Sequence, residues 1–259
     1  MKKTVLITGA SRGIGKSLAN LFAKDGYDLV LVARNKTQLE QNAEQLKKNY
    51  HINAITISKD LSEQNAAQTL FDEITNLGIE IDVLVNNAGI GLAEPFAENE
   101  INMVSAMINI NVLSLTELSR LFLPQMIARK TGKIVNLSST AAFQPGPGMA
   151  VYYASKAYVL SLSQALNYEL KNTGVTVTAV CPGPTQTDFF APAHMIGTNL
   201  ASGKMGMKTP EQVALSAYRG MKRNKRVVIP GFMNYLASKL VVPTSISMGV
   251  VTYLNRKKV

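Results

Sequence analysis

Short apolar runs alternate with longer amphipathic segments along most of this chain of 259 residues. The short runs are apolar at successive positions, as strands are when helices cover both faces of a parallel sheet. The longer segments repeat their apolar side chains at helical spacing. The predicted strands are 4–8, 28–33, 53–58, 82–87, 132–138, 175–181 and 226–230. The predicted helices are about 14–25, 36–49, 62–77, 100–127, 152–172 and 210–223.

This alternation predicts an α/β fold of the Rossmann type, doubly wound, with a mainly parallel seven-stranded sheet and helices on both faces. The length and the 46% hydrophobic content fit one large core, so we expect a single domain over 1–259. A loop rich in Gly, Pro, Met and Phe precedes the last predicted helix. After the last strand, about 232–259 form a basic extension whose two apolar segments are separated by Pro243.

Charge is distributed unevenly along the chain. Residues 1–188 hold 16 basic and 16 acidic side chains, whereas 189–259 hold 11 basic ones and the single acid Glu211, so the net charge of +10 lies there. This excess indicates either a solvated basic face or attraction to an anionic membrane, an acyl carrier or a phosphorylated substrate. The lone Cys181 excludes an intramolecular disulfide and is compatible with a cytoplasmic location. No uncharged apolar run reaches the roughly 18 residues of a spanning helix.

The first predicted strand leads directly into a glycine-rich turn, TGASRGIG at 8–15, which opens the first helix. Glycines at 9, 13 and 15 permit a tight turn and close approach of the backbone to a phosphate. The helix N-terminus adds free N–H groups and the positive end of the helix dipole. The turn is therefore a variant of the dinucleotide-binding fingerprint.

The end of the second strand indicates which dinucleotide binds. An NAD site usually places an acid there, about 20 residues after the glycines. Here Ala33 and Arg34 occupy that place, and Asp28 lies at the opposite end of the strand. Arg34 and Arg12 would pair with a 2′-phosphate, which favours NADP(H) over NAD(H). The alternative is two unrelated surface arginines.

The stretch YYASK at 152–156 places two tyrosines within one helical turn of a lysine. Tyr152 lies four residues before Lys156 and Tyr153 three, and both spacings bring side chains close on a helix. The preceding strand ends in NLSST at 136–140, at the sheet edge where α/β proteins bind ligands. Helical spacing alone leaves both tyrosines as candidates.

Together these motifs resemble the short-chain dehydrogenases/reductases, in their shorter single-domain branch. The matching motifs run in order over about 190 residues and leave little room for another fold. They are TGASRGIG (8–15), NNAG (86–89), NINV (109–112), GKIVNLSS (132–139), YYASK (152–156) and CPGPTQT (181–187).

The resemblance implies a catalytic set of Asn111, Ser139, Tyr152 and Lys156. The family spacing Tyr-x-x-x-Lys selects Tyr152 rather than its neighbour. In such enzymes the tyrosine exchanges a proton with the substrate oxygen, the serine holds that oxygen, the lysine holds the nicotinamide ribose, and the asparagine anchors a water. The Lys156 cation should lower the tyrosine pKa from near 10 by roughly 1–3 units.

The resemblance also implies a cofactor wall built from the ends of several strands. Asp60 is expected near the adenine, NNAG along the wall, and Thr187 beside the nicotinamide amide. The isolated His51 and His194 lack ligand spacing, so no metal site is expected. The expected cofactor-binding residues are Gly9, Ser11, Arg12, Gly13, Ile14, Gly15, Arg34, Asp60, Leu61, Asn87, Ala88, Gly89, Tyr152, Lys156, Pro182, Gly183, Thr185 and Thr187.

The function so implied is an NADP(H)-dependent oxidoreductase that moves a hydride between nicotinamide and a carbonyl or secondary alcohol. The apolar segment DFFAPAHMIG lies within the expected substrate lid, about 186–208, and indicates a lipophilic ketone, steroid-like or 3-oxoacyl substrate, unless it only packs the lid. The alternatives are a sugar-nucleotide-modifying enzyme, which usually carries a larger substrate domain, and a non-catalytic dinucleotide-sensing protein.

The expected partners are a small-molecule substrate and a second copy of the chain, as a homodimer or homotetramer, without nucleic acid. The basic, apolar extension at 232–259 leaves two interpretations open. It docks on anionic lipid, at the inner membrane face, or it is buried in a subunit interface.

Overall fold

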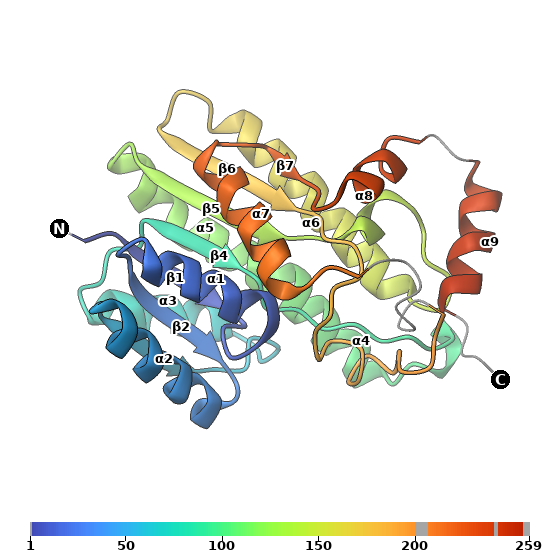
Figure 1. Cartoon of the computed structure of the whole chain (residues 1–259), viewed down its shortest axis with the longest axis horizontal. Coiled ribbons are helices and arrows are strands. Elements are labelled where there is room, and N and C mark those ends of the chain that lie inside the picture. The colour runs from blue at the N-terminus through green and yellow to red at the C-terminus, as the bar shows by residue number, and fades with distance from the viewer. Residues whose placement is uncertain (1, 200–206, 241–242, 256–259) are drawn as a thin grey trace.

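The computed structural model describes residues 2–199, 207–240 and 243–255 (Figure 1). In this part of the chain, seven parallel strands form one sheet in the order β3-β2-β1-β4-β5-β6-β7. The predicted fold class is confirmed. The strands are β1 Thr4–Thr8, β2 Asp28–Ala33, β3 Ala54–Ser58, β4 Val83–Asn86, β5 Gly132–Leu137, β6 Val175–Val180 and β7 Val227–Val228.

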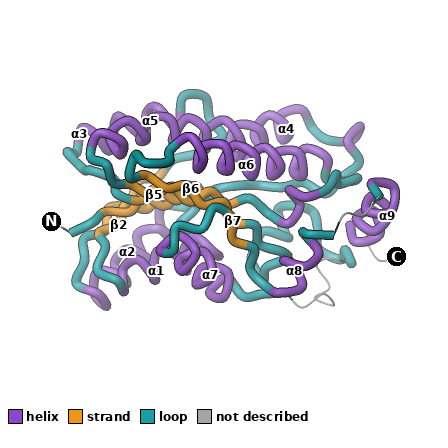
Figure 2. The backbone as a smooth tube through the Cα atoms, turned by 90° about the horizontal axis from the view of Figure 1, so that it is seen from above, coloured by secondary structure: helices purple, strands orange, loops and turns teal. Residues whose placement is uncertain are grey.

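Helices cover both faces of the sheet, as Figure 2 shows: α1, α2 and α7 lie on one face and α3 to α6 on the other. The helices are α1 Gly13–Lys24, α2 Lys36–Tyr50, α3 Ala66–Asn76, α4 Ile101–Ile108, α5 Ser114–Ala128, α6 Ala150–Glu169, α7 Pro210–Lys222, α8 Phe232–Ala237 and α9 Thr244–Asn255. Both α8 and α9 lie at one end of the molecule.

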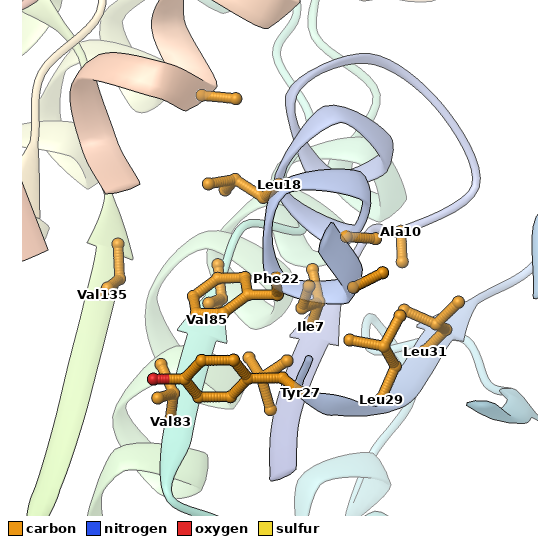
Figure 3. Packing of buried hydrophobic residues seen from close by; sticks show 14 of the residues in the cluster. Ile7, Ala10, Leu18, Phe22, Tyr27, Leu29, Leu31, Val83, Val85 and Val135 are labelled. Carbon is orange, nitrogen blue, oxygen red and sulfur yellow. The ribbon is translucent and has the colours of Figure 1, made fainter. Parts of the chain in front are cut away.

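Two apolar layers hold the helices on the sheet, and they explain why the strands read as continuous apolar runs. Val5 and Ile7 are buried in one cluster with Phe22 of α1 and with Tyr27, which follows that helix. Figure 3 shows the Phe22 ring beside Ile7. Leu6, between them in the sequence, faces the opposite layer with α3 and α5. Burying each such side chain contributes about 1.5–3 kcal/mol to the stability of the fold, so both layers help to hold the helices on the sheet.

The predicted helix 100–127 is one continuous helical stretch that is interrupted by a π-helical segment at Asn109–Leu113. Within the described residues, Ile101–Ala128 is long and apolar enough to cross a membrane. Its inner side chains, including Leu118, Phe122 and Met126, are buried against the sheet in the α3 layer. About a third of its most apolar window is buried in this way, so the stretch serves in part as a layer of the fold.

The last strand, β7, has two residues, whereas the sequence predicts 226–230. It is the edge strand beyond β6, and Pro230 has no N–H to continue the ladder. The apolar extension after it forms α8 and α9, which the sequence analysis left unassigned. Part of the expected lid, residues 200–206, and positions 241–242 and 256–259 of the extension lie outside the described residues.

The strand order places the carboxyl ends of all these parallel strands at one edge of the sheet. The order reverses between β1 and β4, which are hydrogen-bonded neighbours. Crossovers leave that point in opposite directions, so a crevice forms there in doubly wound folds. Every predicted site motif follows a strand at this edge or lies in a helix beside it.

Candidate active site

The glycine turn after β1 is locked to the NNAG motif after β4. The hydroxyl of Thr8 accepts hydrogen bonds from the backbone N–H groups of Asn87 and Ala88, both at 3.0 Å. The Asn87 amide donates in return to the carbonyls of Thr8 and Gly9. A Cβ on Gly15 would lie 2.3 Å from the Gly9 oxygen, so only glycine allows α1 to begin this close to the strand end.

The N-terminus of α1 fits a dinucleotide phosphate. Its N-cap, Arg12, makes no side-chain cap hydrogen bond, which leaves first-turn N–H groups for an anion. Gly13 adopts a φ of 56°, and a Cβ there would lie 3.2 Å from Cγ2 of Thr187. A side chain would therefore fill the cradle between the turn and Thr187. The Ser11 carbonyl is held by the Asn42 amide at 2.7 Å.

The two arginines expected at a 2′-phosphate lie in different ion pairs. Arg34, directly after β2, has Nη1 3.4 Å from Oδ2 of Asp60. Arg12 instead faces the lid, with Nη1 3.7 Å from Oδ2 of Asp188. Both guanidinium groups are well exposed, so a phosphate can reach them. Burial by itself would raise the pKa of Asp60, but hydrogen bonds from Ser62 and the nearby Arg34 together outweigh it and lower that pKa.

Ser139, Tyr152 and Lys156 meet at the end of β5. The Lys156 Nζ donates to the Leu137 carbonyl at 2.9 Å, and the Ser138 hydroxyl donates to the Lys156 carbonyl at 2.7 Å. These bonds fix the start of α6 over the strand end. The Ser139 hydroxyl lies near enough to the Tyr152 phenol to lower its pKa, and the lysine Nζ lies 5.7 Å from the centre of the tyrosine ring.

The pKa values in this cluster differ from the prediction. Burial raises the pKa of Tyr152 to about 12, although the Ser139 hydrogen bond lowers it. Burial likewise lowers the pKa of Lys156 to about 8. The predicted depression of the tyrosine pKa is therefore wrong for this structure, because desolvation of the phenolate dominates. At neutral pH the phenol keeps its proton, which suits a donor to a carbonyl oxygen.

Asn111 holds the backbone that follows NNAG. Its Oδ1 accepts from the Ile90 N–H at 3.0 Å, and its Nδ2 donates to the Ile90 carbonyl at 2.9 Å and to Ser155 Oγ at 3.1 Å. The residue lies in the π-helical segment, a local geometry frequent at functional sites. The side chain thus positions Gly89, which lies against both Asn111 and Lys156. The water-anchoring role remains an expectation of the resemblance.

The other expected cofactor residues lie at the same sheet edge. Leu61 follows β3, and its carbonyl accepts from Ser114 at 2.6 Å. Ile14 packs in the α1 layer. After β6, Pro182 and Gly183 pass next to the catalytic strand end, where the Pro182 carbonyl accepts from the Thr140 N–H. Thr185 forms a β-bridge with Lys208 and so ties together the two ends of the lid.

The sequence analysis missed the residues that cover the catalytic tyrosine. The centre of the Phe189 ring lies 5.5 Å from the centre of the Tyr152 ring. A Cβ on Gly91 would lie 2.6 Å from the Phe189 ring, so a side chain at that position would clash with it. The lid is tied down by a hydrogen bond from the Ala93 N–H to the Ala193 carbonyl and by the pair of His194 with Glu94. Only the aromatic content of DFFAPAHMIG hinted at this cover.

A groove of about 440 Å³ is lined by residues of this lid. It adjoins the nicotinamide end expected at Thr187, but it does not reach the catalytic tyrosine. The groove is lined by Gln186, Thr187, Asp188, Phe190, Ile196, Gly197 and Met207. Across the described residues, no group of three His, Cys, Asp or Glu side chains gathers in a way that would hold a metal ion.

Comparison with known proteins identifies the family. Residues 3–195 match the family model described as short chain dehydrogenase. Ketoacyl reductase HetN from Nostoc sp. is 36% identical over 228 residues, 88% of this chain and 78% of that protein. The very-long-chain 3-oxoacyl-CoA reductase of Homo sapiens is 32% identical over 263 residues, 97% of this chain and 79% of that protein.

Solved structures of short-chain dehydrogenases have the same fold as this chain. A short-chain dehydrogenase from Sphingobium yanoikuyae in complex with NADPH has a TM-score of 0.83 at 32% identity, covering 96% of this chain and 95% of its own. One from Burkholderia phymatum in complex with NAD has a TM-score of 0.81 at 25% identity, covering 92% of each chain.

The chain therefore belongs to the short-chain dehydrogenase family. It is an oxidoreductase that interconverts carbonyl and alcohol groups, with a nicotinamide dinucleotide as cofactor. Enzymes of this family act on small molecules and commonly assemble as oligomers.

Proposed function

We propose that this chain is an NADP(H)-dependent reductase of lipophilic carbonyl compounds, with 3-oxoacyl thioesters as the leading substrate class. One observation carries the proposal: Tyr152 lies near the Ser139 hydroxyl and the buried Lys156, and the Phe189 ring covers the tyrosine ring at 5.5 Å. Proton-donating groups under an apolar cover suit a ketone with a hydrocarbon chain.

The proposed chemistry assigns each catalytic residue a task. A bound nicotinamide would supply the hydride. Ser139 would hold the substrate oxygen by a hydrogen bond, and Tyr152 would deliver its proton to that oxygen. Lys156 would stabilise the phenolate that remains, since its ammonium lies next to the ring. Asn111 would be a positioning residue, because it holds the backbone at Gly89 and Ile90 next to Lys156.

The preference for NADP(H) rests on Arg34. No acid stands at the end of β2, where an NAD site accepts from the ribose hydroxyls, and Arg34 presents an exposed guanidinium there instead. The NADPH-bound relative with 32% identity supports this choice. The cofactor contacts expected from the sequence, from Gly9 to Thr187, belong to the same proposal.

The substrate class rests on the wall around the catalytic tyrosine. Met149, Tyr153 and Met195 are buried together there, and Phe189 and Phe190 pack against them. Methionine and aromatic side chains adapt to hydrocarbon chains. The names of two relatives, a ketoacyl reductase and a very-long-chain 3-oxoacyl-CoA reductase, point to the same class. We also propose a single domain over 1–259 and a cytoplasmic location, compatible with the one free cysteine.

The test follows NADPH absorbance with 3-oxoacyl thioesters of increasing chain length, simple ketones and a steroid ketone. Each buried methylene contributes about 0.8 kcal/mol, so kcat/KM should rise about fourfold per methylene until the pocket is filled. A preference for short, hydrophilic carbonyls would contradict the substrate class. Cofactor binding without turnover of any carbonyl or alcohol would favour the dinucleotide-sensing alternative.

A further inference from the structure

Only one side chain of helix α8 faces the protein body. The helix has six residues, Phe232–Ala237, and all of them are exposed except Asn234. A surface helix is ordinarily held by an apolar stripe that faces the core. In α8 the apolar side chains lie on the outside, so the inward side-chain contact is made by an amide.

Asn234 packs against the turn that follows β6. Its Nδ2 donates to the Pro230 carbonyl at 2.8 Å, which fixes the amide at the start of the helix. A Cβ on Gly183 would lie 2.5 Å from this Nδ2 and 2.9 Å from Oδ1. The amide therefore lies directly against the Gly183 backbone, and any side chain at position 183 would have to displace it.

The start of α8, on which Asn234 depends, is itself fixed. Gly231 adopts a φ of 101°, a conformation that favours glycine, and a Cβ there would lie 2.8 Å from Cε of Lys208. Lys208 forms a β-bridge with Thr185, whose hydroxyl donates to the Gly183 carbonyl at 2.9 Å. The start of α8 and the turn after β6 are thus linked by two routes, one through the Asn234 amide and one through Lys208.

The other side of this turn contacts the catalytic strand end. The carbonyl of Pro182, the residue before Gly183, accepts from the Thr140 N–H at 2.8 Å and from the Ser139 hydroxyl at 3.5 Å. The second distance is well beyond the usual O–H···O distance of about 2.7–2.8 Å, so the serine proton is held weakly and can turn to a substrate oxygen. The place of the Pro182 carbonyl therefore decides how free that proton is.

We propose that Asn234 is a positioning residue for the reaction: it fixes the turn after β6 and so sets the distance between the Pro182 carbonyl and the Ser139 hydroxyl. A carbonyl that moved closer would capture the serine proton and compete with the substrate oxygen. A carbonyl that moved away would leave the hydroxyl without its orientation. In enzymes, a misplacement of about 1 Å can lower the rate about 10²-fold. The role of Asn234 rests on the catalytic role proposed above for Ser139.

The kinetic test compares Asn234→Ala with Met233→Ala, which truncates a neighbouring side chain that is 74% exposed on the same helix. The substrate is the carbonyl compound that the wild type reduces best with NADPH. We expect kcat to fall about five- to tenfold in Asn234→Ala, with the dissociation constant of NADPH within about threefold of wild type, because the glycine turn after β1 is untouched. Met233→Ala should keep the wild-type kcat. Alanine is a better helix former than asparagine, so the loss cannot come from helix propensity.

A double-mutant cycle with Ser139 distinguishes positioning from a general loss of structure. In the Ser139→Ala background, Asn234→Ala should lower the remaining kcat by less than about twofold, because the hydroxyl on which it acts is gone. Equal losses in the two backgrounds would overturn the proposal, and so would a wild-type kcat in Asn234→Ala.

Hydrogen exchange measures the same coupling without a substrate. The Thr140 N–H reports on the turn directly, because it donates to the Pro182 carbonyl. Its exchange, followed by NMR, should be about fivefold faster in Asn234→Ala than in the wild type or Met233→Ala. Unchanged exchange would overturn the positioning role alone. A wild type that reduces no carbonyl, or a Ser139→Ala variant with wild-type kcat, would overturn the proposed function and the positioning role together.

Discussion

Tyr152 and Tyr153 are neighbours in the sequence, but their rings lie in different surroundings. Tyr152 lies near the Ser139 hydroxyl, which lowers its pKa, and its ring packs against Phe189. Tyr153 is buried in the wall with Met149, where its ring fills the space that a side chain on Gly146 would need. The first is placed for chemistry and the second for packing.

The pair gives a direct test of the catalytic assignment. Tyr152→Phe should lower kcat by about 10²–10⁴-fold, because the proton donor is lost while the ring remains. Tyr153→Phe should keep most of the activity and the same cofactor affinity. Steady-state kinetics and NADPH binding by fluorescence measure both. Equal losses in the two variants would show that the wrong phenol was assigned.

Arg34 is the residue that should decide between the cofactors. Arg34→Asp should reduce NADPH affinity about ten- to a hundredfold, since a charge-assisted pair contributes about 1.5–3 kcal/mol, and NADH affinity should fall much less. Lys48→Asp changes the charge equally at a distance and serves as the control. Binding titrations with both cofactors give the result. Equal affinities of the wild type for NADPH and NADH would refute the preference.

The buried Lys156 makes stability depend on pH. Its pKa falls to about 8 in the folded protein, from about 10.4 when unfolded, so between these values the unfolded chain binds more protons. Raising the pH through this window therefore stabilises the fold, by at most about 1.4 kcal/mol per pH unit.

Urea unfolding of the wild type and Lys156→Met isolates that contribution. The difference between their free energies of unfolding should grow in favour of the wild type from pH 8 to pH 10. Tyr152, whose raised pKa opposes the trend at high pH, is present in both proteins, so its contribution cancels to first order. If the difference in the free energy of unfolding does not change with pH, the pKa of Lys156 is not lowered by folding.

For single residues, the sequence predicts which side chains meet at the site better than it predicts their pKa values. Motif spacing was enough to nominate Ser139, Tyr152 and Lys156, and the structure brings them together at one strand end. The direction of the tyrosine pKa was wrong because spacing reports which charge is near, not how much water is excluded. The role of Phe189 was missed for a similar reason: it depends on how the lid folds over Gly91.

Among the elements, the junction of β1 and α1 has the tightest backbone contact of the cofactor site. Gly15→Ala would place a methyl group 2.3 Å from the Gly9 carbonyl oxygen. We expect a loss of stability of about 1–3 kcal/mol and weaker cofactor binding, because backbone must move. Gly249→Ala is the control: it has open space in α9 and should stabilise by about 0.5–1 kcal/mol. Chemical denaturation and cofactor titration measure both effects. If the turn can accommodate a methyl group, Gly15→Ala will be as stable as Gly249→Ala and will bind cofactor as well.

Most elements could be predicted from periodicity because strands between two helical layers are apolar on both faces. Places where a helix or strand is interrupted could not be predicted in this way. The π-helical segment at Asn109–Leu113 keeps the same apolar spacing as the helix around it, so it is invisible to a pattern of period 3.6. β7 ends early at an edge where Pro230 stops the ladder. α8 and α9 were left unassigned because their exposed positions carry apolar side chains, which removes the usual contrast between a buried and a solvent-facing side.

Across the whole molecule, the lid and the C-terminal helix form one wall. Val251 of α9 is buried with Ala193 and Met195 of the lid and Met149 before α6. The Asn199 amide donates to the Tyr253 carbonyl at 2.9 Å, a second link between lid and helix. Segments about 60 and 100 residues apart in the chain thus close the same side of the site. This closure could not be predicted, because no local pattern says where a terminal helix docks.

Two adjacent valines test whether α9 serves the reaction. Val251 is fully buried, whereas Val250 is 54% exposed, so the same substitution acts on opposite faces of one helix. Val251→Asp would bury a charge in the apolar wall, which forces α9 away from the lid and opens the pocket. We expect kcat/KM for a long-chain carbonyl to fall at least tenfold, mainly through KM, while a short substrate loses less. Val250→Asp should leave both values near wild type. If both variants reduce a long-chain substrate as well as the wild type does, the helix is no part of the substrate wall, and its buried face only stabilises the fold.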